Sequence, residues 1–237
     1  MIAHHFSHIG KRKSNQDFVE SHSSNGVNFF IVADGMGGYD HGDIAAQIAV
    51  ENIIVYLSSV DEINQDQIQK AINKANLAIR QKQESLGCKM GATIGGCILK
   101  DTVAHCFWVG DVQIFHFRDK RVNFESKSHT LINELKSGNI INEPSKISKY
   151  KHVVTRSLNG DITKSKAGFH LIHDLQKDDI LMVCTDGVHD IFSSIQIQQI
   201  INSNFSFEES IEIIEKRLII DAIDNASLIA ISTTQEE

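Results

Sequence analysis

Four aspartates of this chain share one local pattern: each lies at the end of an apolar run, beside a glycine or an asparagine. They are Asp34, Asp111, Asp186 and Asp224. An aspartate at the mouth of a buried strand is unfavourable unless a cation or hydrogen bonds compensate its charge. One Asp-Gly pair by itself is typical of a hairpin turn. Four such acids in one chain, if their strand ends converge, indicate a carboxylate cluster.

A carboxylate cluster requires a cation. Unit charges about 4 Å apart repel by roughly 1 kcal/mol in water and by several times more in a partly buried site. A ligand set made of oxygen, without His or Cys, favours hard ions such as Mg²⁺ or Mn²⁺. Two such ions about 3.5–4 Å apart are a common apparatus for hydrolysing a phosphate ester. Periodicity alone leaves open whether the acids converge.

The elements that must position these acids begin with a strand before Asp34. Residues 29–33 are apolar throughout, and glycines at 35, 37 and 38 follow the acid. Glycine allows the backbone to approach closely whatever the acid holds. Apolar residues at 46, 50, 53, 54 and 57 then recur with helical spacing, and a stronger stripe runs through 64–86. We therefore expect amphipathic helices over 43–57 and 64–86.

Short strands dominate the rest of the chain. Apolar runs over 93–99, 102–109, 113–117 and 121–124 follow one another without a helix, which predicts an antiparallel sheet. Residues 128–160 are polar and predict a short helix with a long loop. A strand over 180–185, a helix from about Ser194, a second helix capped by Ser206 and Glu209, and a last strand over 226–232 follow. No repeat or linker interrupts them, so we expect one domain.

Composition narrows the class of protein. The chain has 237 residues, 41% hydrophobic and 22% charged, which is ordinary for a globular protein. Its net charge of −7 argues against a nucleic-acid-binding face, and no Lys/Arg cluster large enough to contradict this is present. No signal-like segment and no apolar run of about 18 residues is present, so we expect no membrane association and a cytoplasmic location. The four cysteines lack metal-site spacing and are interpreted as buried thiols.

The ordered motifs resemble those of the metal-dependent protein phosphatases of the protein phosphatase 2C (PPM) family, in particular its compact bacterial members. The resemblance spans nearly the whole chain. The matching stretches are Gly10-x-Arg12-x-x-Asn15-Gln16-Asp17, Val32-Ala33-Asp34-Gly35-Met36-Gly37-Gly38, Gly91-Ala92-Thr93, Gly110-Asp111, Thr155-Arg156-Ser157-Leu158, Thr185-Asp186-Gly187 and Asp224-Asn225-Ala226-Ser227.

The resemblance implies a fold and an activity. The fold is α+β, a four-layer αββα sandwich in which two antiparallel sheets pack face to face between helices, formed by a single domain over 1–237 with a flap at about 129–151. The activity is hydrolysis of phosphoserine and phosphothreonine in proteins by attack of a metal-bridging water. The implied partners are phosphorylated proteins, targets of an opposing Ser/Thr kinase in signalling, and the enzyme is expected to be a monomer.

The resemblance also implies a role for each site residue. Two Mn²⁺ or Mg²⁺ ions would bind, with a weaker third. Asp34 would bridge the pair, the Gly35 carbonyl and Asp17 (through water) would complete the first ion, and Asp186 and Asp224 would hold the second. The third ion would bind Asp111 with Asp186, and Arg12 would bind the substrate phosphate, which its forked donors suit. Met36 stands where animal relatives often carry His, so no side chain is marked as the general acid.

Two other functions remain to be weighed against this one. A catalytically silent phosphatase-like binding module would usually lack metal acids, yet Asp17, Asp34, Asp186 and Asp224 are all present. A two-metal nuclease is disfavoured by the acidic charge balance. Comparing hydrolysis of a phosphopeptide and of nucleic acid in Mn²⁺ separates the three.

Overall fold

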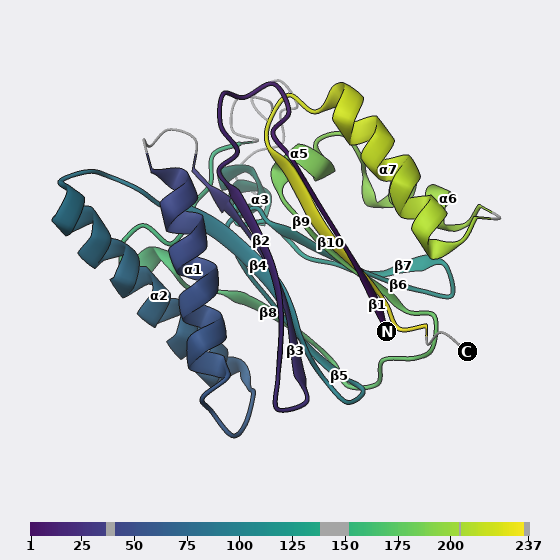
Figure 1. Cartoon of the computed structure of the whole chain (residues 1–237), viewed down its shortest axis with the longest axis horizontal. Helices are drawn as coiled ribbons and strands as arrows, with labels where there is room; N and C mark the ends of the chain where they lie inside the picture. The colour runs from purple at the N-terminus through teal and green to yellow at the C-terminus, as the bar shows by residue number, and fades with distance from the viewer. Residues whose placement is uncertain (37–40, 138–151, 204, 235–237) are drawn as a thin grey trace.

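Two five-stranded antiparallel sheets pack face to face, and helices cover both outer faces (Figure 1). The computed structural model describes residues 1–36, 41–137, 152–203 and 205–234. The arrangement confirms the predicted four-layer αββα sandwich. No helix in these ranges is long and apolar enough to cross a membrane.

The first sheet joins the two ends of the chain. In spatial order it contains β1 (Ile2–His8), β10 (Ala226–Ser232), β9 (Ile180–Cys184), β6 (Gln113–Arg118) and β7 (Arg121–Glu125). Strands β1 and β10 lie side by side along their whole length, with Ile2 opposite Ser232 and His8 opposite Ala226 (Figure 1). The last strand therefore lies inside the sheet, between β1 and β9.

The second sheet is formed mainly by consecutive strands. Its spatial order is β2 (Asp17–Ser24), β3 (Val27–Gly35), β4 (Ala92–Lys100), β5 (Val103–Val109) and β8 (Gly168–Ile172). The predicted strands that became β3, β4 and β5 are confirmed, whereas no strand is predicted for β8. The expectation that the four strands over 93–124 form one sheet is wrong, because β6 and β7 belong to the first sheet. Strand β8 lies at the sheet edge, and most of its residues are only half-buried, so its sequence lacks the apolar run of a central strand.

The helices form two separate layers. Helices α1 (Gly42–Leu57) and α2 (Gln65–Leu86) cover the second sheet, and α5 (Asp186–His189), α6 (Ser194–Ile201) and α7 (Phe207–Asp221) cover the first. The predicted capping box of α7 is confirmed, because Ser206 accepts a hydrogen bond from the Glu209 backbone while the Glu209 side chain accepts one from Ser206 N–H. Two short elements, α3 (Leu131–Ser137) and a 3₁₀ turn (Ile162–Lys164), lie in the connection between β7 and β8.

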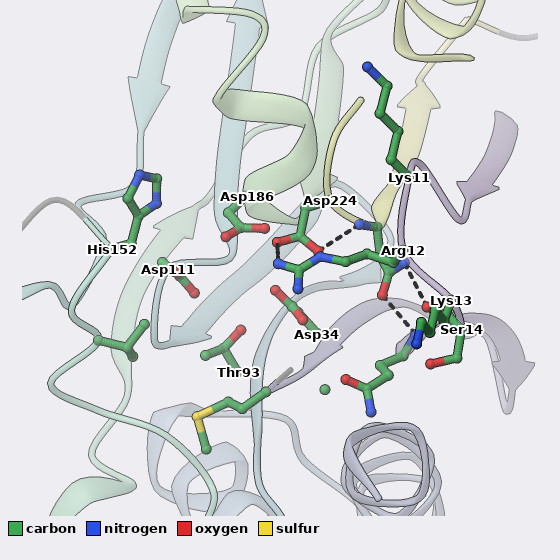
Figure 2. A pocket seen from close by; sticks show the side chains of 15 residues that line it. Lys11, Arg12, Lys13, Ser14, Asp34, Thr93, Asp111, His152, Asp186 and Asp224 are labelled. Atoms are coloured by element: carbon green, nitrogen blue, oxygen red, sulfur yellow. Dashed lines mark hydrogen bonds and ion pairs between the residues drawn. The ribbon is translucent and has the colours of Figure 1, made fainter. Parts of the chain in front are cut away.

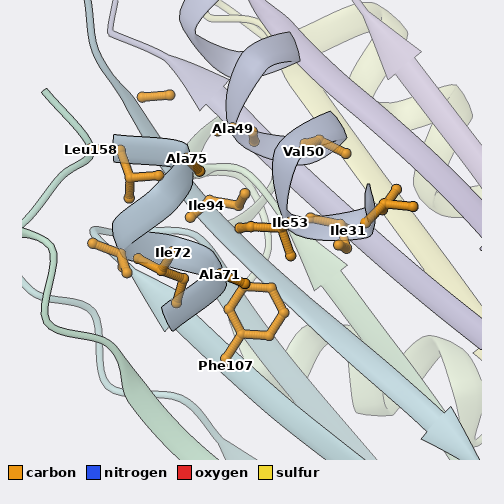
Figure 3. Packing of buried hydrophobic residues seen from close by; sticks show 14 of the residues in the cluster. Ile31, Ala49, Val50, Ile53, Ala71, Ile72, Ala75, Ile94, Phe107 and Leu158 are labelled. Atoms are coloured by element: carbon orange, nitrogen blue, oxygen red, sulfur yellow. The ribbon is translucent and has the colours of Figure 1, made fainter. Parts of the chain in front are cut away.

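Alternating side chains of β3 join two cores. Phe29 and Ile31 pack against α1 and α2 in the cluster that Figure 3 shows, whereas Phe30 and Val32 pack between the two sheets. All four are at most 5% exposed. A one-residue slip of β3 would exchange these two faces, so burial on both sides fixes the register that places Asp34 at the end of the strand.

Several strand ends that carry the predicted acids meet at one end of the sandwich. Asp17 at the start of β2 is the register partner of Asp34, and Asp34 is also opposite Thr93 at the start of β4. In the other sheet, β9 ends immediately before Thr185 and Asp186, beside the start of β10. Because the sheets pack face to face, these ends line a common site.

Two glycines allow the backbones at this end to approach each other. A Cβ on Gly187 would lie 2.1 Å from the Asn225 carbonyl oxygen, and a Cβ on Gly35 would lie 2.3 Å from the Gly42 carbonyl oxygen. Any side chain at either position would push backbone against backbone. Gly187 thereby holds the turn after Asp186 against the start of β10, and Gly35 holds the end of β3 against the start of α1.

Some of the predicted features lie outside the described residues. These are Gly37 and Gly38 of the motif after Asp34, and residues 138–151 of the predicted flap. Within the described part of the flap, the expected short helix is confirmed as α3.

Replacing Gly187 by alanine should destabilise the fold through this close approach. We expect Gly187→Ala to lower the free energy of unfolding by about 3 kcal/mol, because a backbone carbonyl cannot move aside as a side chain can. Urea-induced unfolding measures the change. Gly87→Ala is the control. Gly87 has φ of +63° and open space around it, so Gly87→Ala should lower the free energy of unfolding by about 1 kcal/mol through backbone conformation alone. An equal or smaller loss at Gly187 would contradict this account.

Candidate metal centre

A pocket of about 720 Å³ opens at the end of the sandwich where the strand ends meet. Figure 2 shows the side chains around it, with Asp34, Asp111, Asp186 and Asp224 gathered near its centre. The lining residues are Lys11, Arg12, Lys13, Ser14, Gln16, Asp34, Gly35, Met36, Thr93, Asp111, His152, Val154, Asp186, Asp224 and Asn225. The convergence that the sequence left open is therefore present.

Burial and neighbouring negative charges both disfavour the ionised form of Asp34. Desolvation of its carboxylate raises its pKa well above the ordinary value, and the negative charges of Asp17 and Asp186 raise it further. Strand β3 supplies this residue at its end, and Gly35 continues the strand by one residue. A carboxylate in such a position is stabilised by a cation.

Asp17 lies beside Asp34 on the neighbouring strand. Its Oδ2 accepts a hydrogen bond of 3.0 Å from the Thr185 hydroxyl, which connects the two sheets. Its Oδ1 is buried and has no hydrogen-bond partner among the described residues. Desolvation raises the pKa of Asp17 to about 6. A buried carboxylate oxygen without a donor is a position where water or an ion would restore the lost interaction.

Asp186 and Asp111 face the pocket from the other side. Desolvation, together with the charges of Asp111 and Asp224, raises the pKa of Asp186 to about 8. Asp111 follows β5, is 7% exposed, and has a pKa raised by its burial. The His189 ring donates a hydrogen bond of 3.0 Å to the Asp111 carbonyl oxygen and so joins this turn to α5.

Arg12 reaches into the pocket and pairs with Asp224. Its Nη2 lies 2.5 Å from Asp224 Oδ2, and this hydrogen bond raises the pKa of the guanidinium. Both side chains are only partly buried, with Arg12 50% and Asp224 38% exposed. Figure 2 shows the guanidinium between Asp224 and Asp34.

Asn225 holds the turn that carries Arg12. Its side-chain amide donates to the carbonyl oxygens of Ile9 at 2.9 Å and Ser14 at 3.0 Å, and its Oδ1 accepts from Gln16 N–H at 2.9 Å. One side chain at the start of β10 thus fixes both ends of the turn between β1 and β2. In the sequence it directly follows Asp224, but this bracing role depends on contacts across more than 200 residues.

The residues of the pocket fit a hard divalent cation. The candidate ligands Asp17, Asp34, Asp111, Asp186 and Asp224 offer carboxylate oxygen only, and the Gly35 carbonyl adds another oxygen at the same wall. Desolvation, and after it the negative charge of neighbouring carboxylates, raises the pKa of Asp34 and Asp186, and a bound cation would offset both effects. Oxygen donors in this number favour Mg²⁺ or Mn²⁺ over softer metals.

Sequence reasoning missed two residues beside this site. The ligand atoms of His152, Asp186 and Asp190 lie within 4.8 Å of one another. Asp190 follows Asp186 by four residues across a helical turn, a spacing that could have indicated a shared face. His152 has no such local signal, because it reaches the site from the connection between β7 and β8.

Comparison with known proteins identifies relatives over almost the whole chain. Residues 6–218 match the protein phosphatase 2C family. Protein phosphatase PhpP of Streptococcus pneumoniae is 26% identical over 96% of this chain and 95% of its own length. Serine/threonine phosphatase stp of Listeria monocytogenes is 25% identical over 90% of this chain and 83% of its own length.

Solved structures show the same fold. The serine/threonine phosphatase of S. agalactiae has a TM-score of 0.83 at 23% identity, covering 97% of this chain and 98% of that one. The catalytic domain of the serine/threonine protein phosphatase PstP, solved with two manganese ions, has a TM-score of 0.79 at 21% identity, covering 99% and 98%. The match over residues 6–218 shows that the chain belongs to the protein phosphatase 2C family.

Proposed function

We propose that this protein is a metal-dependent protein serine/threonine phosphatase. One observation supports this most: carboxylates from both sheets surround a pocket that an arginine enters, in a member of the protein phosphatase 2C family. The relatives from S. pneumoniae and L. monocytogenes are named as phosphatases, the latter as a serine/threonine phosphatase. The substrates are phosphorylated proteins.

The proposed ligand sets follow the positions of the acids. Asp34, the Gly35 carbonyl and Asp17 (through water) would hold one ion of Mn²⁺ or Mg²⁺, and Asp34, Asp186 and Asp224 would hold a second. Asp111 and Asp186 would hold a weaker third ion. The presence of two manganese ions in the PstP structure supports the number of tightly bound ions.

In this proposal the chain binds and orients the phosphate ester. The ions would supply Lewis acidity and neutralise charge on the phosphate. Arg12 exchanges its hydrogen bond to Asp224 for the phosphate oxygens, which its forked donors can bind in pairs. Asp34, Asp186 and Asp224 would hold the ions beside the ester.

A covalent cysteine mechanism is disfavoured. Cys184, the cysteine beside Asp186 in sequence, is fully buried, and desolvation raises the pKa of its thiol far above its ordinary value. Such a thiol is inert as a nucleophile. A silent binding module is disfavoured because the candidate ligand acids are all present. A cytoplasmic location, a monomeric state and an opposing Ser/Thr kinase remain predictions.

The first test is metal dependence. Hydrolysis of p-nitrophenyl phosphate and of a phosphothreonine peptide should require Mn²⁺ or Mg²⁺ and cease in EDTA. Asp34→Ala should lower kcat/KM by more than about 100-fold. Even the substitution of residues that only hydrogen-bond to metal ligands commonly lowers metal affinity or activity 10–100-fold. Asp61→Ala, which removes an exposed acid between α1 and α2, should have no effect. Full turnover in EDTA would refute the metal mechanism.

Metal binding should also stabilise the fold. At about 100 times its Kd, an ion that binds the native state alone adds about 2.7 kcal/mol to the free energy of unfolding. For a chain of this size the melting temperature should rise by roughly 5–10 °C. Asp34→Ala should lose most of this rise, yet in EDTA it should be at least as stable as the wild type, because it removes a repelled carboxylate. An equal rise in Asp34→Ala would place the ion elsewhere.

Arg12 should contribute through substrate binding. Arg12→Ala should lower kcat/KM for phosphopeptides about 10- to 100-fold, mainly by raising KM, because charged hydrogen bonds contribute about 1.5–3 kcal/mol. Arg12→Lys should recover only part of this. Because Arg12 also pairs with Asp224, the Kd for Mn²⁺ is measured in parallel by calorimetry. Wild-type kinetics in Arg12→Ala would show that the guanidinium does not bind the phosphate.

A further inference from the structure

The turn between β1 and β2 places three consecutive cations, Lys11, Arg12 and Lys13, at the pocket. The whole chain carries a net charge of −7, so such a group is unusual for its surface. The proposed phosphatase mechanism uses only the middle residue of the three. The two lysines therefore need a separate explanation.

The turn is fixed relative to the pocket. Lys11 N–H donates to the Ile223 carbonyl oxygen at 3.2 Å, and Asn225 binds the backbone on both sides of the lysines. A Cβ on Gly10 would lie 2.1 Å from the Asp224 carbonyl oxygen, and Gly10 has φ of +61°, so only glycine fits there. The backbone of the lysines is thus held against the segment that carries Asp224, just before β10.

The side chains of Arg12 and Lys11 point in different directions. Arg12 points into the pocket toward Asp224, whereas Lys11 extends away from the cluster along its rim (Figure 2). Lys11 and Lys13 are both exposed, and neither takes part in an ion pair within the part of the chain that the structure describes. Their charges are therefore available to a molecule that enters the pocket.

The charges around the pocket are distributed unevenly. Among its described lining residues, every carboxylate is a candidate metal ligand, whereas Lys11 and Lys13 are cations without a ligand role. On the opposite side, beyond Asp186, lies His152 (Figure 2), whose Nδ1 is 3.7 Å from Oδ2 of Asp190. A peptide that crosses the pocket would thus meet two lysines on one side and this His–Asp pair on the other.

We propose that Lys11 and Lys13 select phosphorylated substrates that carry acidic residues on one side of the phosphorylated residue. The inference rests on the proposed function and specifies its substrate class. An acid one to three residues from the phosphate lies within about 10 Å along an extended chain, close enough to meet the turn that holds Arg12 in the pocket. Each exposed ion pair should raise kcat/KM about two- to fivefold, and salt should weaken the effect.

The test compares three phosphothreonine peptides in Mn²⁺. One carries Asp residues before the phosphothreonine, one carries them after it, and one carries Asn at all these positions. The wild type should favour one acidic peptide over the neutral peptide by about 5- to 20-fold in kcat/KM at about 0.1 M salt, and this ratio should fall toward one near 1 M salt. Which acidic peptide is preferred shows in which direction the substrate peptide crosses the pocket.

Variants assign the preference to the turn. The ratio should fall toward one in the Lys11→Ala/Lys13→Ala double variant, persist in the double Lys→Arg variant, and fall below one when both lysines become Glu. Lys100→Ala is the matched control, because Lys100 is exposed and lies seven residues along β4 from Thr93, about 23 Å from the pocket wall. Its ratio should equal that of the wild type.

The outcomes separate this inference from the function on which it rests. If the wild type hydrolyses p-nitrophenyl phosphate and all three peptides at equal rates, the selectivity is refuted while the phosphatase activity stands. An acidic preference that survives in the double Lys→Ala variant would also refute the role of these lysines. If no phosphate ester is hydrolysed in Mn²⁺, the proposed function itself fails.

Discussion

Mutual repulsion among carboxylates at the end of the sandwich is the constraint on which the site depends. Desolvation raises the pKa of Asp34 and of Asp186, and neighbouring carboxylates raise both further: Asp17 and Asp186 act on Asp34, and Asp111 and Asp224 act on Asp186. In the absence of a cation, this burial and repulsion of charge costs stability. Tightly packed sheets on either side prevent these acids from moving apart, as the fully buried β3 core and the contact of Gly187 with Asn225 show. The same rigidity that makes the acids unfavourable alone prepares them to bind ions without rearrangement.

The elements of the fold could largely be predicted from sequence, because their signals are local. The apolar run before Asp34, the stripe along α2 and the Ser206 capping box each depend on neighbours within a few residues. Convergence of the acids could not be predicted that way. Convergence requires β1 to pair with β10 and the two sheets to stack. Neither of these long-range contacts produces a periodic pattern in the amino-acid sequence. The motif resemblance supplied this missing relation.

Residues that reach the site through tertiary contacts escaped prediction for the same reason. His152 approaches from a polar connection, and β8 is an edge strand with half-buried residues. The pairing of Arg12 with Asp224 was equally invisible, although both residues had been assigned roles. That pair joins the residue proposed to bind phosphate to a residue proposed to bind metal, so the two binding events share one carboxylate.

The pairing of β1 with β10 has a consequence for how the protein acquires its site during synthesis. During synthesis the turn with Arg12 precedes its brace, Asn225, and its partner, Asp224, by more than 200 residues. Until then β1 has no neighbour in its sheet, because β10 separates it from β9. Closure of such a long loop is slow and comes late in folding. A nascent or C-terminally shortened chain therefore lacks an assembled pocket, and the pocket forms only once the final strand is in place.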